Sequence, residues 1–103
     1  RVRGLEMVKG IEGGHVDVVH EVPILDNTPF EAELEDSVRK AMIDHPQSSA
    51  VLVRGHGVYI WGRDWVHTKS QAECYDYLFA ASVRLREHGI DASVLGRSHP
   101  RTP

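Results

Sequence analysis

Alternating and continuous apolar stretches along the chain predict three short strands. The run from His15 to Leu25 is rich in β-branched residues and predicts a strand that ends near Pro23. Residues 50–54 and 58–61 are two further apolar runs. Only three residues separate these runs, too few for a crossover connection, so they form either an antiparallel hairpin or one bent strand.

Helical spacing of apolar residues predicts two helices. The first begins at the segment Thr28–Glu31, where a threonine N-cap, a proline at the first helical position and a glutamate at the third form a capping box. It ends before His45, because a residue that precedes proline avoids helical geometry. Its predicted buried stripe consists of Phe30, Leu34, Val38, Ala41 and Met42.

The second helix is predicted to begin after Asp64 as its cap and to end at Gly89. Its apolar stripe consists of Tyr75, Leu78, Phe79, Ser82 and Leu85. Residues 5–11 predict a separate short helical turn that ends near Gly10 or near the glycine pair at 13–14.

These elements predict an α/β fold with an unfinished sheet. Three or four strands with two helices leave one sheet face or edge uncovered, which is typical of half of a larger unit. Residues 97–103 contain two prolines and no apolar anchor, and we expect a loose tail there. The predicted domain therefore comprises residues 1–96.

Composition narrows the possible classes of protein. The chain has 103 residues, 12 Lys plus Arg against 15 Asp plus Glu, and a net charge of -3. This balance gives no electrostatic reason to expect nucleic-acid binding, and no apolar run is long enough to span a membrane. A single cysteine, Cys74, fits a reducing cytoplasm. Seven histidines in 103 residues is a high count, which modestly favours metal binding or proton transfer.

The most distinctive candidate is His56, which stands between two glycines where one apolar run stops and the next begins. Glycine on both sides permits unusual backbone angles and leaves the imidazole open to a ligand. The residues alone fit either a zinc ligand or an ordinary turn histidine.

Glu6 and Lys9 are the second candidates, because a spacing of three residues on a helical turn puts both on one face. The pair fits either a general acid/base with a phosphate-binding partner or a solvated surface ion pair. The other histidines are weaker candidates. His15 and His20 would point to opposite faces of the predicted strand. His45, His67 and His88 are expected to face solvent, and Cys74 is expected to be a small buried residue.

The segments Leu-Val-Arg-Gly-His-Gly-Val-Tyr-Ile-Trp-Gly at 52–62 and Ala-Glu-Cys-Tyr-Asp-Tyr-Leu-Phe at 72–79 resemble the methylthioribulose-1-phosphate dehydratases, a branch of the class II aldolase/adducin superfamily. The segments Glu-Met-Val-Lys-Gly-Ile at 6–11 and Pro23–Pro29 add to the resemblance. It extends from about Leu5 to Asp91.

The resemblance implies a three-layer α/β/α sandwich with a largely antiparallel central sheet, of which this chain is the C-terminal half. It implies Zn²⁺ as cofactor with His56 as its third protein ligand, Glu6 as the catalytic acid/base and Lys9 as a phosphate contact. It further implies a cytoplasmic homotetramer that dehydrates 5-methylthioribulose 1-phosphate in methionine salvage.

The chain departs from the family pattern in one respect. It lacks the upstream His-x-His pair that supplies two zinc ligands, and it lacks the phosphate-binding loop. Another chain supplies the N-terminal half, or the sequence is a fragment, or the protein is no longer an enzyme. Two alternatives therefore stay open beside the dehydratase: a zinc-dependent sugar-phosphate aldolase and a non-catalytic, adducin-like interaction module.

Overall fold

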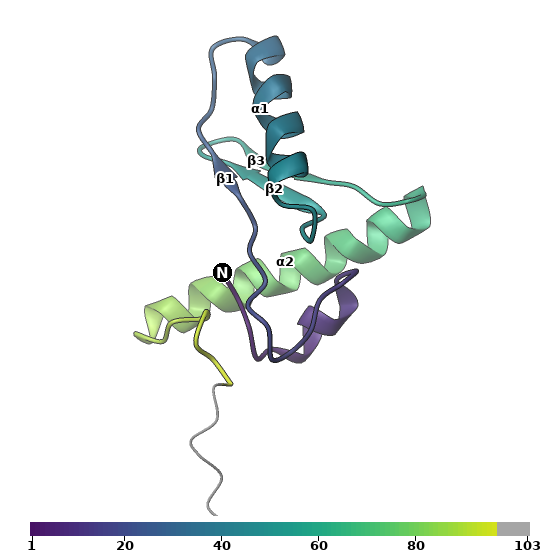
Figure 1. Ribbon diagram of the computed structural model, residues 1–103. Coiled ribbons are helices and arrows are strands. Elements are labelled where there is room, and N and C mark those ends of the chain that lie inside the picture. Colours follow the sequence, from purple (N-terminus) through teal and green to yellow (C-terminus); the bar gives the residue numbers. More distant parts are fainter. Residues whose placement is uncertain (97–103) are drawn as a thin grey trace, which may run out of the picture.

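A computed structural model describes residues 1–96 of the chain; the predicted tail, 97–103, lies outside the described residues. Figure 1 shows the elements, which follow in the order η1 (Glu6–Gly10), β1 (Ile24–Leu25), α1 (Glu31–Asp44), β2 (Ala50–Val53), β3 (Gly57–Ile60) and α2 (Trp65–Glu87). In this part of the chain no helix has the length and apolar character needed to cross a membrane.

The three strands form one sheet in the order β1-β2-β3, with β1 parallel to β2 and β2 antiparallel to β3. The predicted hairpin is therefore confirmed, and the bent single strand is wrong. The sheet of the described residues is mixed rather than largely antiparallel.

The predicted strand over residues 15–25 is wrong except for its last two residues, which form β1. Local hydrogen bonds close the preceding segment into turns, from Gly14 N–H to the Ile11 carbonyl (2.8 Å) and from Val18 N–H to the His15 carbonyl (3.3 Å). Further along, His20 makes an isolated bridge with Val2. Here tertiary context overrides the intrinsic strand propensity of the valines.

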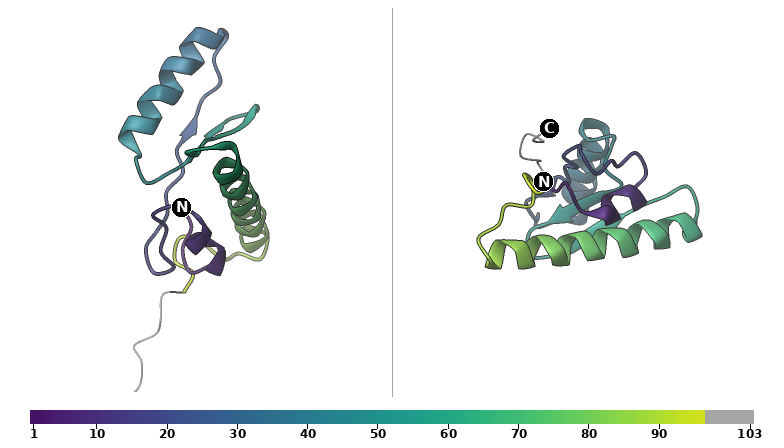
Figure 2. Two further views of the ribbon diagram at one scale, coloured as in Figure 1. Left: turned by 90° about the vertical axis from the view of Figure 1, so that its right-hand side faces the viewer. Right: turned by 90° about the horizontal axis from the view of Figure 1, so that it is seen from below.

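The two long helices lie on opposite sides of the sheet, as Figure 2 shows. This explains why β2 is buried on both faces: Ala50, Val51 and Val53 are all buried, although neighbouring side chains in a strand point in opposite directions. The predicted α/β class is confirmed, and within the described residues the layers run helix, sheet, helix.

Helix α1 begins later than its capping motif predicts. Phe30 occupies the N-cap position, and the Thr28 hydroxyl donates to the Phe30 carbonyl (2.8 Å) instead of capping the helix. The predicted end before His45 is confirmed. Leu34 and Ala41 are buried, but Phe30 is 68% exposed, so the predicted stripe is only partly buried.

Helix α2 begins and ends as the sequence predicts. The Asp64 carboxylate accepts a hydrogen bond from the His67 N–H (2.7 Å), which caps the first turn. At the other end, Gly89 has a φ of 73°, and the Ile90 N–H donates to the Leu85 carbonyl (2.8 Å). This is the Schellman arrangement, in which glycine avoids the penalty of a left-handed backbone.

The core gathers against the buried side of α2, where Tyr75 has no exposed surface. The Tyr75 hydroxyl accepts a hydrogen bond from the Ser49 N–H (2.9 Å) and makes a second with His20 Nε2 (2.9 Å). Burial lowers the pKa of His20 and raises that of Tyr75. Both groups are therefore neutral in the folded protein near pH 7.

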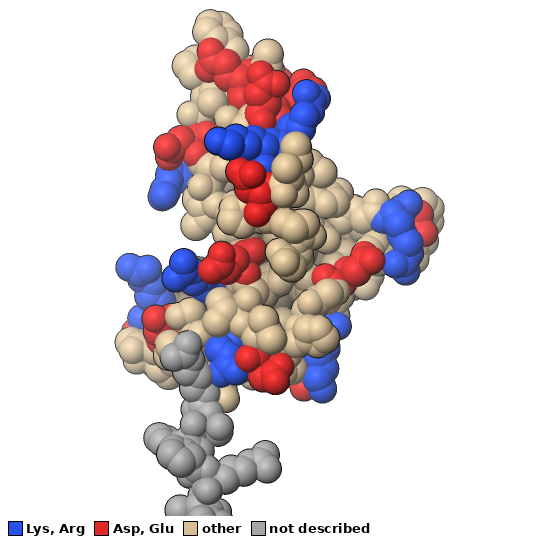
Figure 3. Space-filling view, viewed as in Figure 1, with Lys and Arg blue, Asp and Glu red and all other residues tan. Residues whose placement is uncertain are grey.

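Apolar side chains also remain on the surface. Ile43 is 72% exposed, Trp65 77% and Val66 59%. On the face in Figure 3, uncharged side chains occupy the area between α1 and α2, and acidic side chains gather at the end where α1 begins. Exposed apolar area of this kind is typical of surfaces that contact other protein segments.

The buried His20 predicts a stability that falls in mild acid. Its pKa in the folded state lies below the value of 6.5 expected in the unfolded chain, so the unfolded state binds the proton more readily. The free energy of unfolding therefore decreases as the pH falls below that value. We expect His20→Gln to weaken this decrease in urea titrations between about pH 7 and 5, whereas His88→Gln, at an exposed histidine, should not. An equal pH dependence in wild type and His20→Gln would contradict this account.

Candidate functional site

The short helix η1 presents the first candidate pair. A 3-10 helix has three residues per turn, so residues three apart share a face. Val8 and Ile11 are buried to 0% and 2% exposure on one side. On the other side, Glu6 Oε1 lies 3.0 Å from Lys9 Nζ, with side-chain exposures of 81% and 61%. The prediction that Glu6 and Lys9 share a face is confirmed, and both side chains are open to a ligand.

His56 lies in the turn that joins β2 to β3, and its side chain is exposed. The His56 N–H donates to the Val53 carbonyl (3.1 Å), which closes the turn. Gly55 and Gly57 have φ values of 64° and 154°, so the flanking glycines do supply the unusual backbone angles. The ring stacks on Tyr59 with 5.7 Å between centroids.

The structure does not bring Glu6 and His56 together. Figures 1 and 2 show η1 and the β2–β3 turn apart, with the turn at the end of its two strands and η1 packed against α2. Within residues 1–96, no three His, Cys, Asp or Glu side chains come close enough together to hold a metal ion. The described residues leave His56 exposed but do not form a zinc site by themselves.

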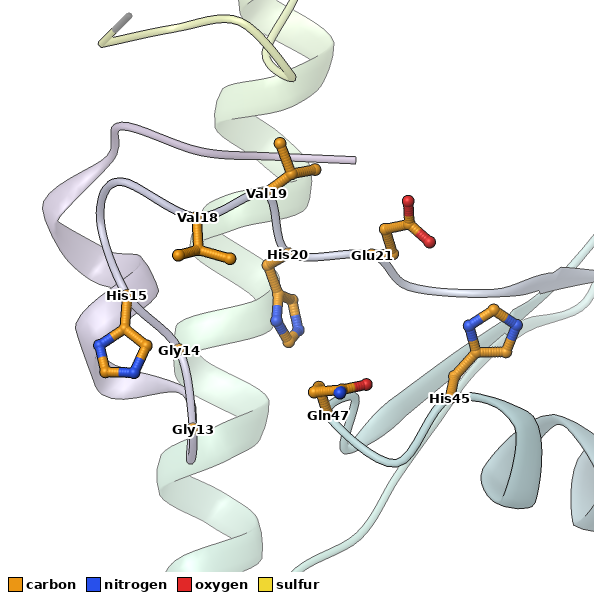
Figure 4. A pocket seen from close by; sticks show the side chains of 9 residues that line it. All are labelled: Gly13, Gly14, His15, Val18, Val19, His20, Glu21, His45 and Gln47. Atoms are coloured by element: carbon orange, nitrogen blue, oxygen red, sulfur yellow. The ribbon is translucent and has the colours of Figure 1, made fainter.

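Three other histidines gather around a pocket of about 280 Å³. In the view of Figure 4, the Gln47 side chain lies between the rings of His20 and His45, and His15 borders the same pocket. The prediction that His15 and His20 point to opposite faces is wrong, because the strand on which it rests does not form. The prediction that His45 faces solvent is also only partly right, because its side chain is half-buried.

His67 was expected in solvent, but its side chain is only 11% exposed. Its Nδ1 accepts a hydrogen bond from the Arg63 N–H (3.1 Å), so the ring proton is on Nε2, which faces Glu12 Oε2 at 3.2 Å. One turn later, the Gln71 side chain is buried and bonds to the main chain at Gly10 and Glu12. A signal for Gln71 exists in the sequence: it lies on the buried stripe of α2, four residues before Tyr75.

Cys74 is buried, as expected, and burial raises the pKa of its thiol. A thiol that is protonated near neutral pH is a poor nucleophile. Cys74 therefore belongs to the packing between α2 and η1, not to the chemistry.

Comparison with known proteins identifies the class to which these features belong. The family described as Class II Aldolase and Adducin N-terminal domain matches residues 2–83, most of the chain. The chain therefore belongs to the class II aldolase and adducin family. The matched residues include η1 with Glu6 and Lys9, the turn with His56 and most of α2.

Individual relatives point to one branch of this family. A protein of Arabidopsis thaliana named as a probable bifunctional methylthioribulose-1-phosphate dehydratase/enolase-phosphatase E1 is 53% identical over 94 residues, which is 90% of this chain. Relatives of the same name are 51% identical in Oryza sativa subsp. indica, over 88% of the chain, and in Populus trichocarpa, over 90%. The chain spans 18% of the length of each of these relatives.

Proposed function

We propose that this chain is the C-terminal part, residues 1–96, of a cytoplasmic methylthioribulose-1-phosphate dehydratase, a lyase of methionine salvage. The observation that carries the proposal is the identity of 50% or more, over about nine-tenths of the chain, with relatives that bear this name. In the proposed whole domain, an N-terminal half completes a three-layer α/β/α sandwich with a largely antiparallel sheet. The exposed apolar side chains between and beside the helices support the packing of such a half against this chain.

The proposed reaction removes water from 5-methylthioribulose 1-phosphate. Glu6, which is open to solvent, takes the proton from C3 of the sugar phosphate. The bond from C4 to its hydroxyl then breaks, the hydroxyl leaves as water with the proton returned by Glu6, and the resulting enol becomes the 2,3-diketo product. Lys9, 3.0 Å from Glu6, is placed to attract the phosphate of the same substrate.

We further propose that His56 is one of the ligands of a catalytic zinc ion. Its accessible imidazole and glycine neighbours fit this role, and the other ligands come from residues outside the described part of the chain. When bound, zinc supplies Lewis acidity that polarises the substrate's C2 carbonyl and makes its C3 proton more acidic.

Because Glu6 and His56 lie apart within one chain, one substrate reaches both only where two copies of the protein meet. A homotetramer with sites at its subunit boundaries supplies such a meeting. The exposed apolar side chains near the start of α2, Trp65 and Val66, support contacts of this kind.

The reaction class is tested by the mass of the product. The purified full-length protein, incubated with 5-methylthioribulose 1-phosphate and Zn²⁺, should yield a single product that is lighter than the substrate by one water. Two smaller carbon fragments would instead identify an aldolase. No turnover, from a folded protein loaded with zinc, would favour the non-catalytic interaction module.

Two substitutions separate the roles of the candidate residues. Glu6→Gln should keep bound zinc but lower kcat by about a hundredfold or more, because it removes the acid/base group and keeps its size. His56→Ala should lower the zinc content measured by atomic emission. Lys40→Gln, on α1 at an exposed position, is the control for both. Near-normal turnover in Glu6→Gln, or full zinc content in His56→Ala, would remove that residue from the site.

Subunit mixing tests whether the two residues act across a boundary. Glu6→Gln and His56→Ala subunits are inactive alone, but a mixed tetramer contains some boundaries with an intact Glu6 and an intact His56. Random mixing in equal amounts should restore about one quarter of the sites. If both residues served a substrate within the same subunit, mixing would restore no activity.

A further inference from the structure

Gln71 on α2 uses both ends of its side-chain amide to hold one short segment of main chain. Its Nε2 donates to the Gly10 carbonyl (2.8 Å), and its Oε1 accepts from the Glu12 N–H (3.0 Å). The side chain is only 3% exposed, so water does not compete for these two bonds. The amide thereby makes the main-chain hydrogen bonds that a neighbouring strand would otherwise make with residues 10–12.

The segment that Gln71 holds is the end of η1, the turn that carries Glu6. Other contacts fix the same end against α2. A side chain on Gly10 would begin 2.5 Å from Cys74 Sγ, so main chain and helix are in close approach there. The His67 imidazole adds its contact to the Glu12 carboxylate at 3.2 Å.

By itself, η1 has little to keep it in place. It is a 3-10 helix of five residues without a side-chain cap at Leu5, and such short helices are marginal in isolation. Its exposed Glu6–Lys9 ion pair adds little stability. The orientation of Glu6 therefore depends on the buried attachments of η1 to α2, of which the Gln71 amide makes two.

We propose that Gln71 is a positioning residue for Glu6. It acts through the main chain at Gly10 and Glu12, holding η1 in the position from which the Glu6 carboxylate meets the substrate. The inference rests on the proposed acid/base role of Glu6, and it assigns Gln71 no contact with the substrate.

The first test compares two buried substitutions on α2 in the full-length enzyme. Gln71→Leu removes both bonds to η1 and should lower kcat by about tenfold or more, with KM changed less than about twofold, because a small misplacement of a reacting group is costly. Tyr75→Phe is the matched control. It also removes two hydrogen bonds, but these go to His20 and Ser49 and not to η1. We expect Tyr75→Phe to lower the melting temperature and to keep kcat.

The second test is a double-mutant cycle with Glu6→Gln. If Gln71 acts through Glu6, Gln71→Leu should cause no further fall in kcat once Glu6 is replaced. The same fall in both backgrounds, or an equal loss of kcat in Tyr75→Phe, would overturn the positioning role. If Glu6→Gln itself keeps full turnover, the proposed function fails instead, so the two failures are distinguishable.

A third variant covers the case in which leucine at this position prevents folding. Gln71→Glu keeps the shape and still accepts from the Glu12 N–H, but a carboxylate cannot donate to the Gly10 carbonyl. The protonated acid can donate. The kcat of Gln71→Glu relative to wild type should therefore rise as the pH is lowered. A ratio that stays constant across the pH range would overturn the proposal.

Discussion

The hydroxyl of Tyr75 is the point on which the rest of the fold depends. It joins α2 to the start of β2 through the Ser49 N–H and to the turns after η1 through His20. These three segments are far apart in the sequence. In a fully buried position, each bond forms without competition from water, and losing one leaves a polar group that nothing else satisfies. The start of β2 and the segment around His20 are thereby attached to the same stretch of one helix.

Contacts other than those of the Tyr75 hydroxyl hold η1 in place and so position Glu6 and Lys9. The His20 bridge to Val2 fixes the chain as it enters η1, and Gln71 fixes it as it leaves. Val8 and Ile11 pack in the same hydrophobic core as Tyr75 and Leu78, which completes the attachment of η1 to α2. Glu6 and Lys9 are exposed because they lie on the side of η1 opposite the buried Val8 and Ile11. An exposed acid on a well-anchored turn is suited to proton transfer, since its reactive end is free while its main chain is not.

The elements that the sequence predicts correctly are those defined by local chemistry. Asp64 and Gly89 mark the ends of α2, and the glycines around His56 mark the hairpin turn, because caps and turns depend on neighbouring residues only. The strand over residues 15–25 is wrong because turns and the bridge from His20 to Val2 fix this segment, and these contacts override the strand propensity of its valines. The buried roles of His67 and Gln71 depend on where η1 docks, which spacing along the chain does not reveal.

Within a single chain, the separation of Glu6 from His56 limits what the described residues can do. General acid/base catalysis requires the carboxylate to lie within hydrogen-bonding reach of the proton that it removes. A proposed zinc ligand at the β2–β3 turn and a proposed acid on η1 cannot satisfy that requirement for one substrate while they lie apart in one chain. The apolar side chains that remain exposed beside α2 and the incomplete site thus both require a further protein segment. The protein segment that covers them also decides which His56 a given Glu6 can meet, so assembly and chemistry are coupled in the proposed enzyme.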